Sequence, residues 1–145
     1  SQTKGKNVYA DKNELRRVLV NLCGNAVKFS KINGEIKITT SIMNENDLKI
    51  TIEDKGEGIS KEELPQLFNR FISFNDSGKT NIKNINSTGL GLYLSKKIIE
   101  AHNGKIWVES IKGNGSKFFI LLVNCLNVIN SDFKLEEKKS EKIKI

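Results

Sequence analysis

The sequence predicts an α+β fold, a two-layer sandwich in which helices cover one face of a mixed, mostly antiparallel sheet. Two observations indicate it. A helical stripe of apolar residues is followed by two runs of alternating residues around a polar turn, and a second helix is followed by another pair of such runs. Strands joined by tight turns pair antiparallel, and amphipathic helices bury their apolar stripes against a sheet.

The length and composition suit a single cytoplasmic domain. The chain has 145 residues, 37% of them hydrophobic, which is enough for one core. Its apolar runs are shorter than the roughly 20 residues that cross a bilayer, and its first six residues do not resemble a secretory signal. We leave open whether a longer protein carries a membrane anchor. Cys23 and Cys125 are isolated in the sequence, so we expect two reduced thiols.

The net charge of +7 allows an anionic partner, but the lysines are scattered along the chain. Nucleic-acid binders gather basic residues into a patch with stacking aromatics. We therefore expect no nucleic-acid partner.

The first helix is expected from Asp11 to about Ser30, because Asp11 and Glu14 have capping-box spacing. Six residues share one apolar stripe on the helical wheel: Leu15, Val18, Leu19, Leu22, Ala26 and Phe29. Val20 and Val27 fall outside the stripe, which predicts that the back of this helix is also partly covered.

The rest of the chain alternates strands with helices. Residues 35–42 and 48–54 predict a hairpin, the capping-box pair Ser60 and Glu63 predicts a short helix to about Phe68, and residues 72–87 predict a long polar loop. A second helix is expected over residues 88–102, followed by strands at 105–110 and 117–123. We place the domain at residues 1–123 and a polar tail or linker at 124–145.

The apolar face predicted for the second helix consists of Leu90, Leu94, Ile98 and Ala101. His102 is expected at its end as a residue that favours the helix dipole when charged, with no catalytic role.

Asp54 is the first candidate site residue. Along its predicted strand Leu48, Ile50 and Ile52 share a face, and the alternation turns Asp54 inward. A buried carboxylate needs hydrogen-bond donors, either from a ligand or from backbone amides of the following turn. Gly56 and Gly58 would let a flat ring approach the backbone. A simple glycine turn remains the alternative.

Asn21, Asn25 and Lys28 form a narrow polar strip beside the apolar stripe of the first helix. Amide oxygens suit Mg²⁺, and a nearby lysine suits the phosphates that the cation bridges. An ordinary solvated helix edge is the alternative.

The start of the second helix, STGLGL at residues 87–92, suits phosphate because free N–H groups and the helix dipole attract anions. It matches neither the P-loop pattern nor the dinucleotide fingerprint.

Together, these segments resemble the ATP-binding catalytic domain of two-component sensor histidine kinases, within the superfamily that includes gyrase-type and chaperone ATPases. The resemblance covers roughly residues 8–123. NLCGNAVKFS at 21–30 is similar to the asparagine box, DKGEGI at 54–59 and TGLGL at 88–92 to the glycine boxes, LFNRF at 67–71 to the phenylalanine box, and GNGSKF at 113–118 to the closing turn.

The resemblance implies ATP and Mg²⁺ as ligands. It implies that Asn25 and Asn21 hold the metal, that Lys28 meets the phosphates, that Asp54 accepts from the adenine amino group, and that residues 72–87 form a mobile lid. The implied binding residues are Asn21, Asn25, Lys28, Phe29, Asp54, Gly56, Gly58, Ile59, Phe71, Ser87, Thr88, Gly89, Leu90, Gly91, Leu92 and Ser116.

The resemblance also implies partners. The phosphoacceptor histidine belongs to a separate helical dimerisation domain, so the fragment alone is expected to bind nucleotide and barely turn it over. A response regulator receiver domain and a homodimeric full-length kinase are further expectations. Ser73 stands where many relatives carry a basic residue, and Arg70, Lys79 or Lys83 are the candidate substitutes.

Two other classes remain open. A gyrase-like or chaperone-like ATPase needs a glutamate four residues before the metal-binding Asn25, where this chain has Asn21. The second class is a nonenzymatic module. It would either bind nucleic acid or an acidic protein through a basic surface, or be a degenerate kinase domain that acts as a scaffold without catalysis.

Overall fold

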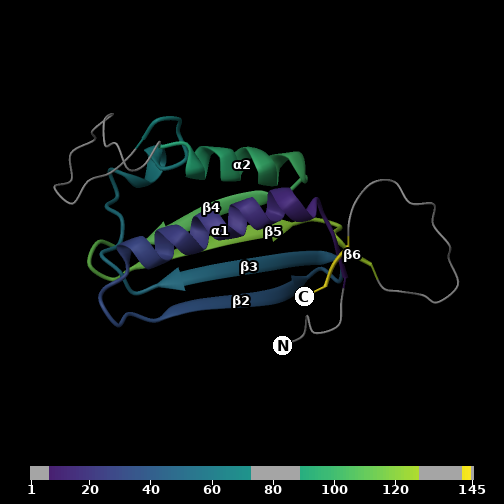
Figure 1. Cartoon of the computed structure of the whole chain (residues 1–145), viewed down its shortest axis with the longest axis horizontal. Helices are drawn as coiled ribbons and strands as arrows, with labels where there is room; N and C mark the ends of the chain where they lie inside the picture. The colour runs from purple at the N-terminus through teal and green to yellow at the C-terminus, as the bar shows by residue number, and fades with distance from the viewer. Residues whose placement is uncertain (1–6, 73–88, 128–141, 145) are drawn as a thin grey trace, which may run out of the picture.

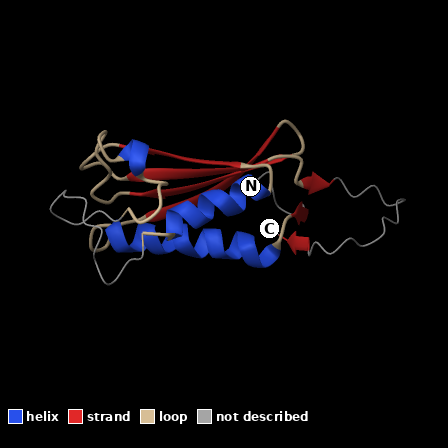
Figure 2. Ribbon diagram, turned by 90° about the horizontal axis from the view of Figure 1, so that it is seen from above, coloured by secondary structure: helices blue, strands red, loops and turns tan. Residues whose placement is uncertain are grey.

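The computed structural model describes residues 7–72, 89–127 and 142–144, and within them the α+β class is confirmed. The main sheet has the strand order β2-β3-β5-β4 and every neighbouring pair is antiparallel, so the parallel component we allowed for is missing from this sheet. Figure 1 shows the sheet behind α1, and Figure 2 shows both helices on one face of it. The strands are β2 (Ile36–Met43), β3 (Asp47–Asp54), β4 (Lys105–Ser110) and β5 (Ser116–Leu122).

Helix α1 (Lys12–Phe29) begins where the sequence predicted. The Asp11 carboxylate accepts hydrogen bonds from the backbone N–H groups of Asn13 (2.9 Å) and Glu14 (3.0 Å), which satisfies two donors that the helix leaves free. The expected cover on the back of the helix is wrong, because Val20 is 64% and Val27 67% exposed. The residues of α1 that are buried against the sheet are Leu15, Val18, Leu22 and Ala26.

Helix α2 (Gly91–Ala101) buries a different face from the predicted one. Ser95 and Ile99 are buried, whereas Leu94 is 40% exposed and Ala101 is also exposed. The pattern failed because apolar residues surround this helix on several sides, and because a serine occupies the buried face. That serine is accommodated by a hydrogen bond from Asn21 of α1.

His102 joins the end of α2 to the beginning of α1. Its Nδ1 lies 2.8 Å from the Ile98 carbonyl oxygen, and its Nε2 accepts from the Asp11 backbone N–H at 3.0 Å. His102 therefore ends the helix as expected, and its ring connects the last turn of α2 to the first residues of α1.

The predicted short helix before the long loop is a single 3₁₀ turn, η1 (Leu64–Gln66). The capping box in front of it is confirmed: the Ser60 N–H donates to Glu63 Oε2 at 2.9 Å, and the Glu63 N–H donates to Ser60 Oγ at 3.3 Å. Pro65 near its start lacks an N–H, which an opening turn tolerates.

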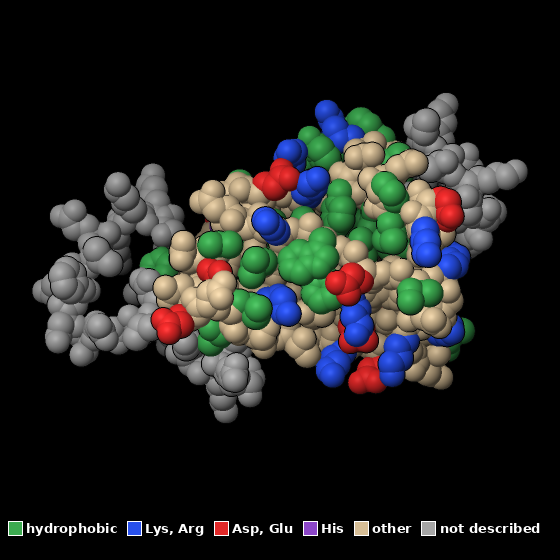
Figure 3. All heavy atoms as spheres, turned by 180° about the vertical axis from the view of Figure 1, so that it is seen from behind, with side chains coloured by type: hydrophobic (Ala, Val, Ile, Leu, Met, Phe, Trp, Pro, Cys, Tyr) green, Lys and Arg blue, Asp and Glu red, His purple; other side chains and the backbone are tan. Residues whose placement is uncertain are grey.

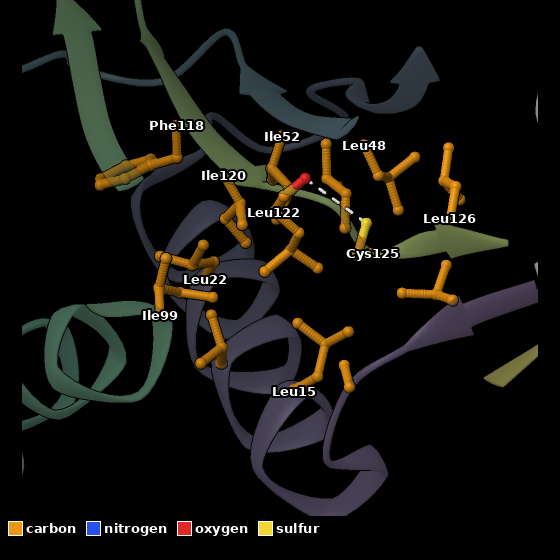
Figure 4. Close-up of a cluster of buried hydrophobic side chains, with 14 of the residues drawn as sticks. Leu15, Leu22, Leu48, Ile52, Ile99, Phe118, Ile120, Leu122, Cys125 and Leu126 are labelled. Atoms are coloured by element: carbon orange, nitrogen blue, oxygen red, sulfur yellow. Dashed lines mark hydrogen bonds between the residues drawn. The ribbon is translucent and has the colours of Figure 1, made fainter. Parts of the chain in front are cut away.

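The core lies between the helices and the sheet, and Figure 4 shows its side chains converging from α1, α2, β3 and β5. It extends past residue 123: Cys125 and Leu126 are each only 4% exposed, and the Cys125 thiol donates to the Leu122 carbonyl at 3.4 Å. Burial raises the pKa of both cysteine thiols, which keeps them protonated. Strand β1 (Asn7–Tyr9) pairs with β6 (Leu126–Asn127) and β7 (Lys142–Lys144) in a second, small sheet.

Among the described residues, α1 and α2 both lie on one face of the main sheet and no helix covers the other (Figure 2). Trp107 and Phe119 occupy paired positions that alternate with the partly buried Ile106 and Val108 of β4 and with the buried residues of β5, and their rings stack with centroids 5.0 Å apart. Seen from behind in Figure 3, hydrophobic side chains lie among basic and acidic ones. Among the residues described, neither α1 nor α2 combines the length and hydrophobicity of a membrane-spanning helix.

Candidate functional site

A pocket opens where β3 stops, α1 ends and α2 begins. These element ends lie on the left of Figure 1. Its empty volume is about 650 Å³, part of it open to solvent. Helices, strand ends and turns all contribute to its wall. The residues that line it are Asn25, Phe29, Asp54, Glu57, Gly58, Ile59, Glu63, Leu67, Leu92, Lys112, Ser116 and Phe118.

Asp54 ends β3 and reaches the pocket from the buried face of the sheet. Its inward orientation confirms the strand alternation, since only 5% of its surface is exposed. Burial raises the pKa of the Asp54 carboxyl and the charge of Glu53 adds to this, while the N–H groups of Gly56 and Ser116 work in the opposite direction. The Gly56 N–H donates to Oδ1 at 2.8 Å. The Asp54 side chain is thus fixed by the Gly56 N–H and presents a hydrogen-bond acceptor to a largely apolar pocket.

The turn after β3 requires glycine at two positions. A methyl group on Gly56 would collide with the carbonyl oxygen of Phe29, at the end of α1. Gly58 has φ +64°, and a methyl group there would collide with the carbonyl oxygen of Ile111. These two glycines let the β3 turn press against both the end of α1 and the β4–β5 turn.

The β4–β5 turn closes over Asp54 from the other side. Gly115 has φ +86°, and a methyl group on it would collide with the Asp54 carbonyl oxygen. Ser116 is paired directly opposite Asp54 in the sheet and is 7% exposed. The Gly113 N–H donates to the Glu57 carbonyl at 2.6 Å, and Lys112 Nζ lies 3.7 Å from Glu57 Oε2. The two turns are therefore joined by a main-chain hydrogen bond and an ion pair.

The polar strip of α1 divides between two surroundings. Asn25 is half-buried and lines the pocket together with Phe29. Lys28 is exposed, with its Nζ 5.1 Å from the centre of the Phe29 ring. Asn21 does not line the pocket, and its Nδ2 donates to Ser95 Oγ at 3.0 Å. Its amide oxygen faces Gly91, where a methyl group would collide with it.

The start of α2 faces the same end of the molecule. Leu90 occupies the N-cap and makes no side-chain hydrogen bond to the first turn, and Leu92 lines the pocket. Backbone N–H groups at a helix start without a side-chain cap suit a phosphate. Ser87 and Thr88 lie outside the described residues, as do Ser73, Lys79, Lys83 and most of the expected lid.

Phe71 lies at the edge of the site, outside the pocket lining. It has φ +62°, and its N–H donates to the Gly89 carbonyl at 3.0 Å. Gly89, with φ +61°, is held so close to Phe71 that a methyl group would meet its carbonyl carbon at 2.7 Å. The Arg70 guanidinium stacks over the rings of Phe71 and Tyr93.

Sequence reasoning missed several pocket residues. Glu57 lies within the quoted glycine box, so the motif itself could have pointed to it. Lys112 precedes the segment quoted as the closing turn and Phe118 is the last residue of that segment; both become pocket residues because β5 places the turn beside Asp54. Glu63 was predicted as a capping-box residue and Leu67 as the first residue of the phenylalanine box, but neither pattern indicates that the side chain lines the pocket.

The sequence matches a known family over most of its length. A family model described as histidine kinase-, DNA gyrase B-, and HSP90-like ATPase matches residues 10–124. The chain belongs to this ATPase family.

Within that family, the similar proteins are histidine kinases. The chain is 38% identical over 116 residues to the adaptive-response sensory kinase SasA of Crocosphaera subtropica, and the match covers 79% of this chain but 29% of SasA. The catalytic domain of histidine kinase ThkA superposes with a TM-score of 0.65 at 32% identity, covering 81% of this chain and 70% of that one. The resemblance to histidine kinase catalytic domains is confirmed.

A third similarity concerns a nucleotide complex. The structure of full-length ShkA in complex with AMPPNP superposes with a TM-score of 0.68 at 25% identity, covering 83% of this chain and 23% of that one. The chain thus corresponds to the ATPase domain of sensor kinases and spans less than a third of the length of SasA or ShkA.

Proposed function

We propose that this domain binds Mg-ATP and donates its γ-phosphoryl group to a histidine in a helical dimerisation domain of a longer sensor kinase. The observation that carries the proposal is the buried Asp54 carboxylate at the closed side of a pocket whose other wall is formed by Asn25 and the start of α2. The AMPPNP in the similar ShkA complex supports nucleotide as the occupant.

Adenine is proposed to bind at the Asp54 side of the pocket. Ionised Asp54 can only accept hydrogen bonds, which suits an exocyclic amino group. Ile59, Leu67 and Phe118 supply apolar surface for a flat ring. Base stacking against apolar walls with one oriented acceptor is the usual construction of a small-ligand site.

The phosphates and Mg²⁺ are proposed to bind near α1 and the start of α2. The Asn25 amide oxygen is the candidate metal ligand, because it lines the pocket and hard cations take oxygen ligands. When bound, Mg²⁺ supplies charge neutralisation to the phosphate oxygens. Lys28 extends from the same helix edge into solvent, where it can meet an anionic chain, and the α2 N-terminus can donate backbone hydrogen bonds to it.

The surroundings of the pocket carboxylates favour phosphoryl transfer to histidine over hydrolysis of ATP by water. Among the described pocket residues three are acidic, and each has a partner: Asp54 accepts from Gly56, Glu57 lies beside Lys112, and Glu63 accepts from Ser60. A gyrase-like mechanism needs a general base oriented toward water. Asn21 occupies the place of that base and is hydrogen-bonded to Ser95.

The remaining components belong to the longer kinase. We propose that the acceptor helical domain forms a homodimer, that a response regulator receiver domain takes the phosphoryl group onward, and that this domain works in the cytoplasm, where ATP is available. The names of the similar sensory kinases support this setting.

Calorimetric titration with ATP, with and without Mg²⁺, tests the proposal. We expect wild-type binding that Mg²⁺ strengthens, and an Asn25→Ala variant that loses most of the Mg²⁺ effect, about tenfold in affinity, while still binding free nucleotide. Steady-state hydrolysis by the isolated chain should stay close to background. Rapid turnover without a partner would contradict the kinase assignment, and failure to bind ATP would contradict the site.

A further inference from the structure

Ser110, the last residue of β4, lies behind the pocket and does not line it. Its hydroxyl oxygen makes three hydrogen bonds that connect separate parts of the site. The Ile59 N–H donates to Ser110 Oγ at 2.8 Å, Ser110 Oγ donates to the Gly115 carbonyl at 2.7 Å, and Ser116 Oγ lies 2.9 Å away. Ser110 thus joins the β3 turn, the β4–β5 turn and β5.

These three contacts determine where the hydroxyl protons are. A serine hydroxyl has one proton and two acceptor lone pairs. A carbonyl oxygen can only accept, so the Ser110 proton is used on Gly115; an N–H can only donate, so one lone pair is used on Ile59. The bond between the two hydroxyls must therefore be donated by Ser116. The proton and both lone pairs of the Ser110 hydroxyl are then engaged in hydrogen bonds, and so is the single hydroxyl proton of Ser116.

Ser116, unlike Ser110, lines the pocket opposite Asp54. With its proton held by Ser110, its oxygen can only accept hydrogen bonds from a ligand. An ionised Asp54 carboxylate is also an acceptor only. Asp54 and Ser116, which are paired across β3 and β5, therefore present two neighbouring acceptors to the pocket.

We propose that Ser110 is a positioning residue that makes the pocket select a 6-amino purine over a 6-oxo purine. This inference rests on the proposed nucleotide-binding function. The two protons of an amino group satisfy the two acceptors, whereas a 6-oxo oxygen would face them with no donor. A site discriminates strongly against a ligand that leaves its buried polar groups without hydrogen-bond partners. Without Ser110, the Ser116 hydroxyl can rotate and donate to a 6-oxo group.

The test compares the affinities for ADP and inosine 5′-diphosphate, which differ at the purine edge. Wild type should prefer ADP. Ser110→Ala should lower the ADP-to-IDP affinity ratio about tenfold, the effect of one hydrogen bond, because Ser116 becomes able to donate. Ser110→Thr keeps the hydroxyl and should keep the wild-type ratio. The ratio is informative because a merely loosened turn would weaken both nucleotides equally.

Ser116→Ala provides a second test if Ser110→Ala does not fold. It should also lower the ratio, and the Ser110→Ala/Ser116→Ala double variant should show the ratio of Ser116→Ala alone. An unchanged ratio in Ser110→Ala or in Ser116→Ala overturns the inference while leaving nucleotide binding standing. Absence of ADP binding by wild type overturns the proposed function itself.

Discussion

At the adenine end of the pocket, formed by residues 54–59 and 110–116, two hydrogen bonds join the turns: the Gly113 N–H donates to the Glu57 carbonyl and the Ile59 N–H donates to Ser110 Oγ. At the proposed phosphate end the groups are side chains and a helix terminus: Asn25 lines the pocket, Lys28 and the start of α2 lie nearby, and Asn21 is bonded to Ser95 of α2. Lys28 is exposed and Asn25 half-buried there, whereas Asp54 and Ser116 are both below 10% exposed.

The difference indicates two kinds of recognition. A base has a fixed shape, so a rigid surface built before binding recognises it at little entropic cost. A triphosphate with its metal is flexible and highly charged, and exposed side chains can arrange around it as it binds. Changes at the adenine end should therefore act on stability and selectivity together, and changes at the phosphate end mainly on charge-dependent affinity.

The largest expected effect comes from two glycines in one turn. Gly115 and Gly113 have nearly equal φ angles, +86° and +88°, but a methyl group on Gly115 would collide with the Asp54 carbonyl, whereas one on Gly113 would meet nothing within 4 Å. We expect Gly113→Ala to cost about 1 kcal/mol from backbone strain and Gly115→Ala about 3 kcal/mol or more. Urea denaturation measures both. Equal losses would show that the turn is not interlocked with β3.

A smaller effect is expected where the helices meet at the phosphate end. Asn21→Ala and Ser95→Ala should each destabilise the domain by about 1 kcal/mol, and the double variant should lose no more than one of them, because they share one hydrogen bond. Additive losses would mean that the bond contributes nothing.

The same Asn21→Ala variant distinguishes positioning from metal binding. If Asn21 acts by holding α2 against α1, its loss should weaken ADP binding equally with and without Mg²⁺. The matched Asn25→Ala variant should instead show a loss only when Mg²⁺ is present. If Asn21→Ala lost ADP affinity only in the presence of Mg²⁺, Asn21 would be a metal ligand and not a positioning residue.

The smallest effect concerns stability without nucleotide. Because burial raises the pKa of Asp54 above its usual 3.8, the folded state holds the proton more tightly than the unfolded state. Stability is then highest below the usual pKa and falls as the pH rises through the raised one. Asn does not ionise, so Asp54→Asn does not lose stability as the pH rises. We expect its melting temperature to be higher than that of wild type at neutral pH, but not higher at pH 3. Parallel pH profiles would contradict this.

The local features were predictable from the sequence. Alternation in β3 turned Asp54 inward because a half-buried strand repeats every two residues, and the caps at Asp11 and Ser60 followed from short-range hydrogen bonding. Gly56 and Gly58 likewise predicted the tight turn that follows β3. Each of these predictions depends on neighbours within a few positions.

The features that were missed depend on distant contacts. Ser110 bonds Ile59 from 51 positions away, and no periodicity relates them. The buried face of α2 was misjudged because Ser95 is buried only through its partner on α1. Cys125 and Leu126 looked like part of a polar tail, yet they are buried beside β1. Such placements follow from the topology of the sheet.

The most direct test of the account is nucleotide affinity in two variants of one strand. Asp54 and Asp47 stand at opposite ends of β3, both are buried, and each accepts a backbone hydrogen bond, from Gly56 and Asn124 respectively. Calorimetric titration with ADP and Mg²⁺ should show that Asp54→Asn loses about a hundredfold or more in affinity, because the amide presents a donor where an acceptor is needed. Asp47→Asn should bind as wild type does. Equal affinity in Asp54→Asn and wild type would remove Asp54 from the site and with it the proposed orientation of the nucleotide.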